Sequence, residues 1–340
     1  MLYNSYMKFL RKIVCLLVIV MITCGCSASK NYIAYTVYPI GYLLNRIGDN
    51  RIKTTSIQTN EIVQVAKLQD NYLDLLNDSM VLFRIGDLEP YMDVYNNKIK
   101  ETDVKTIDLS VLNALYKYKR YVPINVEGKI NYVETDYYDD PSFSSIDMYD
   151  LDPFIWLSPI GMYSMAKDIN DYLTSNYVEQ SEFFNENYEV LCDELIALDA
   201  AYNALSMQLV KQNKSIKFVS VSGSFGCWQK DYGFQVYPLC LSKYGALPNE
   251  KQLEIIKQKI KADGVEWIAY EPNMSDDMIM IFNEIESELG LKRVTLYNIS
   301  SLTASQVDAG KDYMSMMYEN LNILQNMVST QNTAEVTSGE

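Results

Sequence analysis

Residues 179–212, EQSEFFNENYEVLCDELIALDAAYNALSMQLVKQ, separate the two halves of this chain and determine how they are joined. Apolar residues recur there every three or four positions, and neither glycine nor proline interrupts the pattern. The recurring residues are Tyr188, Leu191, Leu195, Leu198, Tyr202, Leu205 and Leu209. This spacing places one apolar stripe along a helix of about 30 residues, which is about 45 Å long. We predict a rigid interdomain helix, with a coiled-coil arm as the alternative.

On both sides of this helix, segments rich in β-branched and aromatic residues alternate with helical patterns. The expected strands are residues 33–40, 80–83, 217–222, 234–239, 267–271 and 293–299, and the expected helices are 65–77, 249–262 and 276–289. Alternation of this kind indicates parallel sheets flanked by helices. The predicted fold is therefore α/β, with two lobes joined by one long helix. The expected parts are an N-terminal lobe (26–178), the connecting helix (179–212), a C-terminal lobe (213–328) and a disordered tail (329–340).

The N-terminus has the pattern of an exported protein. A basic segment, residues 8–12, precedes an apolar run, residues 13–22, and Gly25-Cys26 follows. About ten apolar residues are too few to span a bilayer but suit the core of a signal peptide. The pattern resembles a bacterial lipobox, which predicts a signal peptide at residues 1–25 and lipidation at Cys26, with Cys24 as the other candidate. An uncleaved anchor is the competing interpretation, and both place the rest of the chain outside the cytoplasm.

Composition excludes several classes of function. The net charge is −15 and becomes −18 once residues 1–25, with three positive charges and no negative one, are removed. Such a surface repels nucleic acid and anionic lipid headgroups. None of the 340 residues is histidine, which excludes Ser-His-Asp and Cys-His catalytic groups and His-Glu-x-x-His zinc sites. A glycine-rich phosphate loop is absent too, so we predict that the protein is not an enzyme.

Three cysteines remain beyond the N-terminal segment: Cys192, Cys227 and Cys240. An odd number cannot form a complete set of disulfides. A bridge between Cys227 and Cys240 in an oxidising exterior and buried free thiols both remain open at this point.

The segment Asp152-Pro153-Phe154-Ile155-Trp156-Leu157 resembles the Asp-Pro-His-Ile-Trp-Leu signature of the zinc- and manganese-binding lipoproteins of ABC importers. Further blocks similar to this family follow in order along the chain: residues 37–40, 88–91, 222–226, 271–272 and 312–321. The resemblance covers nearly all of the chain after Cys26. It implies two α/β lobes joined by one long helix, with a metal ion held in the cleft between them.

The positions that match the family's metal ligands carry unsuitable side chains. The three family histidines fall on Val63, Phe154 and Ser222, and the late aspartate falls on Tyr297. Valine and phenylalanine offer no lone pair, and neutral hydroxyl groups are poor ligands for zinc. The family implies zinc or manganese, but we predict no metal ligand and no cofactor for this chain. Both metals should bind weakly.

Other residues near the predicted cleft leave several alternatives open. Glu271, Cys227 and the acidic loop of residues 136–140 could rebuild a cation site, or they could be a structural carboxylate, a packed thiol and a solvated loop. Trp156 and Arg84 could add to an aromatic pocket for a small solute. Alternatively, side chains fill the cleft. We expect a closed, dry cleft in which Phe154 and Tyr297 approach each other.

These patterns support one functional hypothesis and two alternatives. The hypothesis is a lipid-anchored, monomeric solute-binding protein on the outer face of the cell membrane, which works with an ABC permease and has an altered ligand site. The first alternative is an interaction or scaffold lipoprotein that kept the fold and lost transport. The second is a binder of a small non-metal solute.

The lipobox pattern generates a prediction about anchoring. Cys26→Ala removes the thiol directly after Gly25, so the protein should leave the membrane fraction or accumulate as an unprocessed precursor. Fractionation followed by mass analysis of the N-terminus measures both effects, with Cys192→Ala as the matched control. Normal processing and membrane retention of the Cys26→Ala protein would contradict lipidation at this residue.

Overall fold

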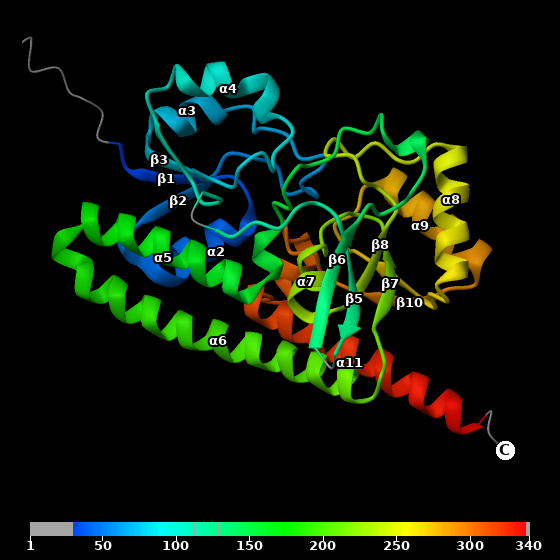
Figure 1. Cartoon of the computed structure of the whole chain (residues 1–340). Coiled ribbons are helices and arrows are strands. Elements are labelled where there is room, and N and C mark those ends of the chain that lie inside the picture. Colours follow the sequence, from blue (N-terminus) through cyan, green and yellow to red (C-terminus); the bar gives the residue numbers. More distant parts are fainter. Residues whose placement is uncertain (1–29, 112, 128, 338–340) are drawn as a thin grey trace, which may run out of the picture.

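The computed structural model describes residues 30–111, 113–127 and 129–337, which form two α/β lobes side by side (Figure 1). Residues 1–29, with the predicted signal peptide and Cys26, lie outside the described part. Among the described residues, none of the helices combines the length and the apolar character needed to cross a membrane. The architecture confirms the predicted fold class.

The N-terminal lobe is built on a parallel sheet with the order β2-β1-β3-β4. Its strands are β1 (Tyr32–Tyr35), β2 (Lys53–Ser56), β3 (Ser79–Arg84) and β4 (Lys105–Asp108). Successive side chains on a strand point to opposite faces. Ile33 and Phe83 accordingly belong to the large core that continues into the other lobe. Ala34 and Leu82 belong to a separate small core.

Helices cover both faces of this sheet (Figure 1). They are α2 (Tyr38–Gly48), α3 (Tyr72–Asn77), α4 (Met92–Lys100) and α5 (Pro159–Asn176). Residues of α3 and α4 supply the small core, whereas α2 and α5 pack against α6 on the other side. Short 3₁₀ turns occur at Asp49–Arg51, Pro141–Phe143, Ile155–Leu157 and Val178–Gln180.

The C-terminal lobe has a second parallel sheet, with the order β10-β9-β7-β8. Its strands are β7 (Lys217–Ser220), β8 (Gln235–Pro238), β9 (Trp267–Tyr270) and β10 (Lys292–Thr295), and its helices are α7 (Cys227–Tyr232), α8 (Glu250–Ala262), α9 (Asp276–Leu289), α10 (Ala304–Asp308) and α11 (Tyr313–Thr337). A capping box at Asn249 starts α8, because Asn249 and Gln252 exchange side-chain to backbone hydrogen bonds.

Helix α6 (Ser181–Lys211) joins the lobes as one unbroken helix along the base of the molecule (Figure 1). All residues of the predicted stripe are buried except Tyr188, which is partly buried. The helix packs on α2 and α5 of the first lobe and on α7 and α11 of the second. Near its end the Tyr202 hydroxyl donates to the Met317 carbonyl at 2.8 Å. The interdomain helix is thus confirmed, and the coiled-coil alternative is wrong.

A β-hairpin corrects the domain boundary that we expected at residue 178. Strands β5 (Arg120–Val126) and β6 (Lys129–Thr135) were assigned to the N-terminal lobe, but they pack on the C-terminal lobe. The Arg120 guanidinium donates to the Tyr237 hydroxyl at 2.6 Å and lies 3.3 Å from the Asp263 carboxylate. Farther on, the Tyr138 hydroxyl donates to the Pro238 carbonyl at 2.8 Å. These contacts are far apart in sequence, so local patterns could not reveal them.

Two local expectations were also wrong. The expected helix at residues 65–77 begins only at Tyr72, because residues 58–68 form a turn closed by a bridge between Gln58 and Leu68. The tail that we expected to be disordered from residue 329 is helical as far as Thr337. No glycine or proline occurs between Tyr313 and Thr337, so nothing ends the helix once its buried first half has formed.

Helix α6 gives a prediction about stability. Leu198 is fully buried on the stripe, whereas Ile196 is 51% exposed on the opposite face. Leu198→Ala should lower the free energy of unfolding by about 3 kcal/mol, because it removes buried contacts and leaves a cavity. Ile196→Ala should change it by less than about 0.5 kcal/mol. Urea denaturation of both variants measures the difference, and equal losses would contradict the assignment of the two faces.

Candidate functional site

The signature segment leads from the hairpin side of the molecule into α5. After Phe154 it makes the 3₁₀ turn Ile155–Leu157, and α5 begins at Pro159. Proline suits the first turn of a helix because its fixed φ is already helical. The hydroxyl of Ser158, the residue before it, accepts from the Gly161 amide at 3.4 Å. This start of α5 fixes Phe154 and Trp156 at the boundary between the lobes.

Two of the four expected positions carry apolar side chains that pack in the core. Val63, Phe154 and Trp156 are fully buried in the core that extends through both lobes. The Phe154 ring lies edge-on to Tyr149 and Trp156, with centroid distances of 5.7 and 5.5 Å. Edge-to-face contacts of this kind stabilise an aromatic cluster beyond simple burial. Neither Val63 nor Phe154 can coordinate a cation.

A polar cluster occupies the third expected position. The Ser222 amide donates to Glu271 Oε1 at 2.9 Å, and its hydroxyl donates to Oε2 at 2.5 Å. Asn298 Nδ2 donates to the same Oε2 at 2.7 Å. These residues follow strands β7, β9 and β10, whose carboxyl ends meet at one edge of the sheet, where ligands bind in open α/β sheets.

The hydrogen bonds in this cluster leave little capacity for a metal ion. Burial raises the pKa of Glu271, and the donors from Ser222 and Asn298 act in the opposite direction. Asn298 is itself held, because its Oδ1 accepts from Asn273 at 2.9 Å and from the Ser300 amide at 3.1 Å. A cation at Glu271 would have to displace these donors. Among the described residues, no group of three His, Cys, Asp or Glu side chains is placed to hold a metal ion.

Direct hydrogen bonds join the signature segment to the C-terminal lobe. Trp156 Nε1 donates to the Asn298 carbonyl at 2.8 Å, and the Tyr313 hydroxyl donates to the Trp156 carbonyl at 2.7 Å. The Tyr38 amide at the start of α2 donates to the Ser300 carbonyl at 3.3 Å. The two lobes are therefore in direct contact through these buried groups.

The fourth expected position, Tyr297, faces away from this cluster. Its hydroxyl accepts from Lys311 Nζ at 3.0 Å, and the same ammonium group lies over its ring. The expected approach of Tyr297 to Phe154 is not observed, and Phe154 packs on Tyr149 and Trp156 instead. Neighbouring residues in extended chain point in opposite directions, so the inward side chain is that of Asn298.

Comparison with known proteins agrees with this architecture. A family model, "Zinc-uptake complex component A periplasmic", matches residues 33–327. The chain belongs to this family. A component of an uptake complex binds its cargo rather than converting it, and membership of the family confirms that the chain is not an enzyme.

Individual relatives match only part of the chain. The zinc-binding lipoprotein AdcA of Streptococcus pneumoniae is 29% identical over 176 residues, 52% of this chain and 34% of that protein. The high-affinity zinc uptake system protein ZnuA of Bacillus subtilis is 25% identical over 174 residues, 51% of this chain and 52% of that protein. The alignments thus span only about a third to a half of these relatives.

Solved structures of this family share the fold over most of the chain. The Zn(II)-bound ZnuA-like domain of Streptococcus pneumoniae AdcA has a TM-score of 0.61 and 22% identity, covering 88% of this chain and 98% of that one. The AdcAII protein of the same organism has a TM-score of 0.66 and 18% identity, covering 87% and 98%. At these identities the comparison establishes the fold alone.

The remaining candidates from the sequence have ordinary structural roles. Arg84 donates to the Gly86 carbonyl in its own loop. In the acidic loop, Asp136 pairs with Lys119, and Asp140 pairs with Lys251 at 3.1 Å. The three described cysteines, Cys192, Cys227 and Cys240, are buried free thiols, so no Cys227–Cys240 bridge forms.

Glu89, in one of the blocks that resemble the family, is an unusual buried acid. Both of its carboxylate oxygens are buried and lack a hydrogen-bond partner among the described residues. Burial raises the pKa of Glu89 to about 7, and the neighbouring Thr36 and Arg84 only partly oppose the shift. The carboxyl group is therefore partly protonated near neutral pH.

The opposite orientations of Asn298 and Tyr297 generate a prediction. Asn298→Ala leaves the buried Glu271 carboxylate and Asn273 amide short of partners, and should lower the free energy of unfolding by about 2–3 kcal/mol. Tyr297→Phe removes one partly exposed hydroxyl and should cost less than about 1 kcal/mol. Thermal and urea denaturation measure both. A larger loss for Tyr297→Phe would mean that Tyr297, not Asn298, holds the cluster together.

Proposed function

We propose that this chain is an extracytoplasmic, lipid-anchored solute-binding protein of an ABC importer, with an interlobe site that no longer suits zinc or manganese. Membership of the zinc-uptake family and the two-lobed fold support the role as a binding subunit. The replacement of ligand positions by Val63 and Phe154, and the closed cluster around Glu271, support the altered site.

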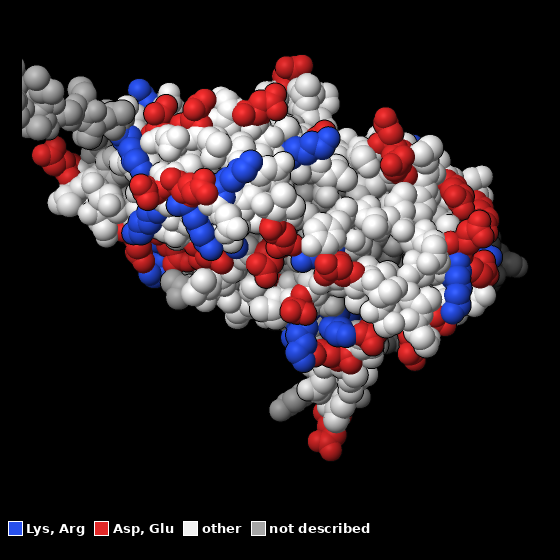
Figure 2. Space-filling model, turned by 90° about the horizontal axis from the view of Figure 1, so that it is seen from above, with Lys and Arg blue, Asp and Glu red and all other residues white. Residues whose placement is uncertain are grey.

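The partners and location follow from the same membership. Relatives are named lipoproteins and zinc uptake proteins, which supports an ABC permease as the partner and the outer face of the membrane as the location. Lipid attachment at Cys26 and a monomeric state are part of this proposal. On the face shown in Figure 2, Lys and Arg side chains are interspersed with Asp and Glu, which together with the net charge of −15 argues against nucleic acid as a partner.

The apolar replacements explain how the lobes close without cargo. Burying one large apolar side chain contributes roughly 1.5–3 kcal/mol, and Phe154 and Val63 are both fully buried. A vacant cluster of histidine and carboxylate groups would instead carry unpaired polar atoms, at a cost of about 1–3 kcal/mol each. The substitutions therefore favour a closed state that needs no bound metal.

The same closed contact favours one alternative function, a scaffold lipoprotein that interacts with partners but does not capture cargo in the cleft. A protein held closed by the bonds from Trp156 and Tyr313 has no obvious opening step. Reconstitution with a candidate ABC permease from the same organism separates the two functions. Stimulation of the ATPase activity of the transporter supports the importer, and absence of any effect supports the scaffold.

Metal titration tests the altered site. Calorimetry on the purified chain should give dissociation constants weaker than about 1 μM, or about −8 kcal/mol, for both zinc and manganese. The combined substitutions Val63→His, Phe154→His, Ser222→His and Asn298→Asp should create tighter zinc binding. A control with Tyr297→Asp in place of Asn298→Asp should gain less, because Tyr297 points outward. Submicromolar zinc binding by the unmodified chain would contradict the proposal.

A further inference from the structure

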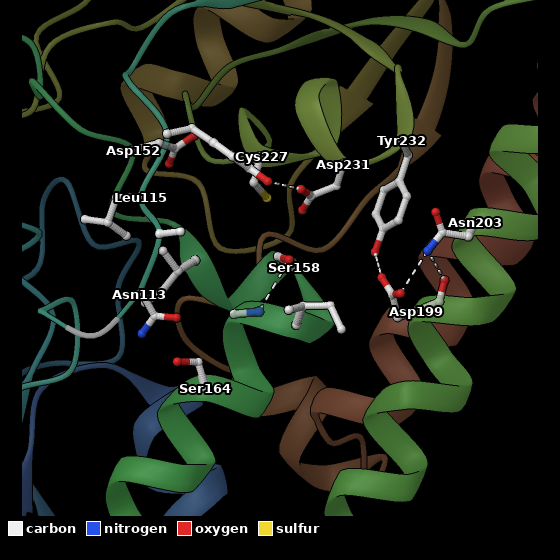
Figure 3. A pocket seen from close by; sticks show the side chains of 15 residues that line it. Asn113, Leu115, Asp152, Ser158, Ser164, Asp199, Asn203, Cys227, Asp231 and Tyr232 are labelled. Carbon is white, nitrogen blue, oxygen red and sulfur yellow. Dashed lines mark hydrogen bonds between the residues drawn. The ribbon is translucent and has the colours of Figure 1, made fainter. Parts of the chain in front are cut away.

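A cavity of about 410 Å³ lies beside the signature segment (Figure 3), and its lining includes none of Ser222, Glu271 and Asn298. Its walls come from the loop at residues 113–116, the start of α5, the middle of α6, and α7. It thus lies where the lobes and the connecting helix meet. Exposed Ala114 and Ile160 lie at its rim, and Asp152, only 5% exposed, lies deeper. A volume of this size is typical of sites for small organic ligands.

The cavity has a strongly one-sided charge. Asp152, Asp199 and Asp231 line it, and none of the described residues in its walls is Lys or Arg. Figure 3 shows Asp152 on one side of the space, Asp231 near its middle and Asp199 on α6 at the other side. The three carboxylates are therefore spread around the cavity rather than gathered at one point. This agrees with the lack of a three-ligand metal cluster among the described residues.

One of these carboxylates has a buried acceptor atom without a partner among the described residues. Asp231 Oδ1 accepts from the Tyr116 hydroxyl at 2.8 Å, but its buried Oδ2 has no hydrogen-bond partner among the described residues. The Asp152 side chain accepts a hydrogen bond at Oδ1 from the Phe154 amide, at 3.0 Å. Asp199 is better satisfied, because it accepts from the Tyr232 hydroxyl at 2.9 Å and from Asn203 at 2.8 Å.

Burying carboxylates without a counter-charge is costly. Burial raises the pKa of Asp152 to about 7 and also raises that of Asp231, where the Tyr116 and Ser158 hydroxyls only partly oppose the shift. A cationic group in the cavity would supply both the missing charge and the missing donors. Charge-assisted hydrogen bonds of this kind are about twice as strong as neutral ones.

The remaining walls suit a short hydrocarbon chain. Leu115, Ile155 and Ile160 contribute apolar surface to the walls that the carboxylates also line. A ligand that fits this pattern has two positive ends joined by methylene groups. We propose that this cavity binds a small aliphatic diamine, with one ammonium group at Asp231 and Asp152 and the other toward Asp199. This site is separate from the four positions that match the family's metal ligands, and it does not depend on the importer function.

Isothermal titration of the full-length chain in detergent with 1,4-diaminobutane tests the proposal, with 1,4-butanediol as the uncharged control. We expect the diamine to bind with a dissociation constant below about 1 mM and the diol to give no heat of binding. Asp231→Asn and Asp199→Asn should each weaken diamine binding about tenfold or more. Asp277→Asn, an identical change at an exposed position on α9, should leave it unchanged.

Thermal melts establish that each variant is folded. Both residues are partly exposed, so if the Asp231→Asn protein does not fold, the Asp199→Asn protein decides the outcome. The proposal is overturned if the diamine does not bind, if the diol binds equally well, or if Asp277→Asn weakens binding as much as the cavity variants. It is also overturned if magnesium or zinc competes with the diamine at equal concentration, because the site would then be a metal site.

Discussion

The buried carboxylate of Glu271 is the constraint on which the boundary between the lobes depends. A charge-bearing group in the core is tolerated only when donors surround it, and here Ser222 and Asn298 supply those donors. Holding Asn298 in place also fixes its backbone carbonyl, which receives the hydrogen bond from Trp156. One buried acid thus orients two loops of the C-terminal lobe and the signature segment that leads into α5.

The two-lobed fold and the side chains at the expected ligand positions have different physical origins. The fold rests on two parallel sheets and on the apolar stripe of α6, and neither requires a metal ion. The four expected ligand positions lie in loops rather than in helices or strands, where substitutions change function more readily than architecture. Val63 and Phe154 belong to the buried core, so these two positions contribute apolar packing to the fold.

Periodic patterns in the sequence predicted the long-range architecture well and the site less well. The stripe from Leu191 to Leu209 predicted the bounds of α6 closely, because apolar residues recur along the one face of the helix that is buried. The packing of the hairpin β5–β6 on the C-terminal lobe was not predicted, because its partners, such as Tyr237 and Asp263, are more than a hundred residues away in the sequence. Asn298 was missed because a shift of one residue in extended chain exchanges an inward side chain for an outward one.

The sequence signal that could have identified Asn298 is its polar side chain next to Tyr297, because a buried Glu271 carboxylate needs nearby hydrogen-bond donors. The sequence alone does not show that Glu271 needs donors, because the burial of Glu271 depends on the packing of β7, β9 and β10 together. The acidic loop shows the opposite case. Its composition suggested a cation site, but pairing of Asp140 with Lys251 depends on contact with α8, which local sequence does not specify.

The buried acids Glu89 and Asp152 make the stability of the fold depend on pH. Their pKa values are raised to about 7 by burial, so the folded chain holds protons that the unfolded chain releases near pH 4. Their contribution to stability is fully present below about pH 4 and is lost as the pH rises through about 7. With respect to these two groups, mild acid strengthens the fold, in contrast to proteins whose paired carboxylates make them unfold in acid.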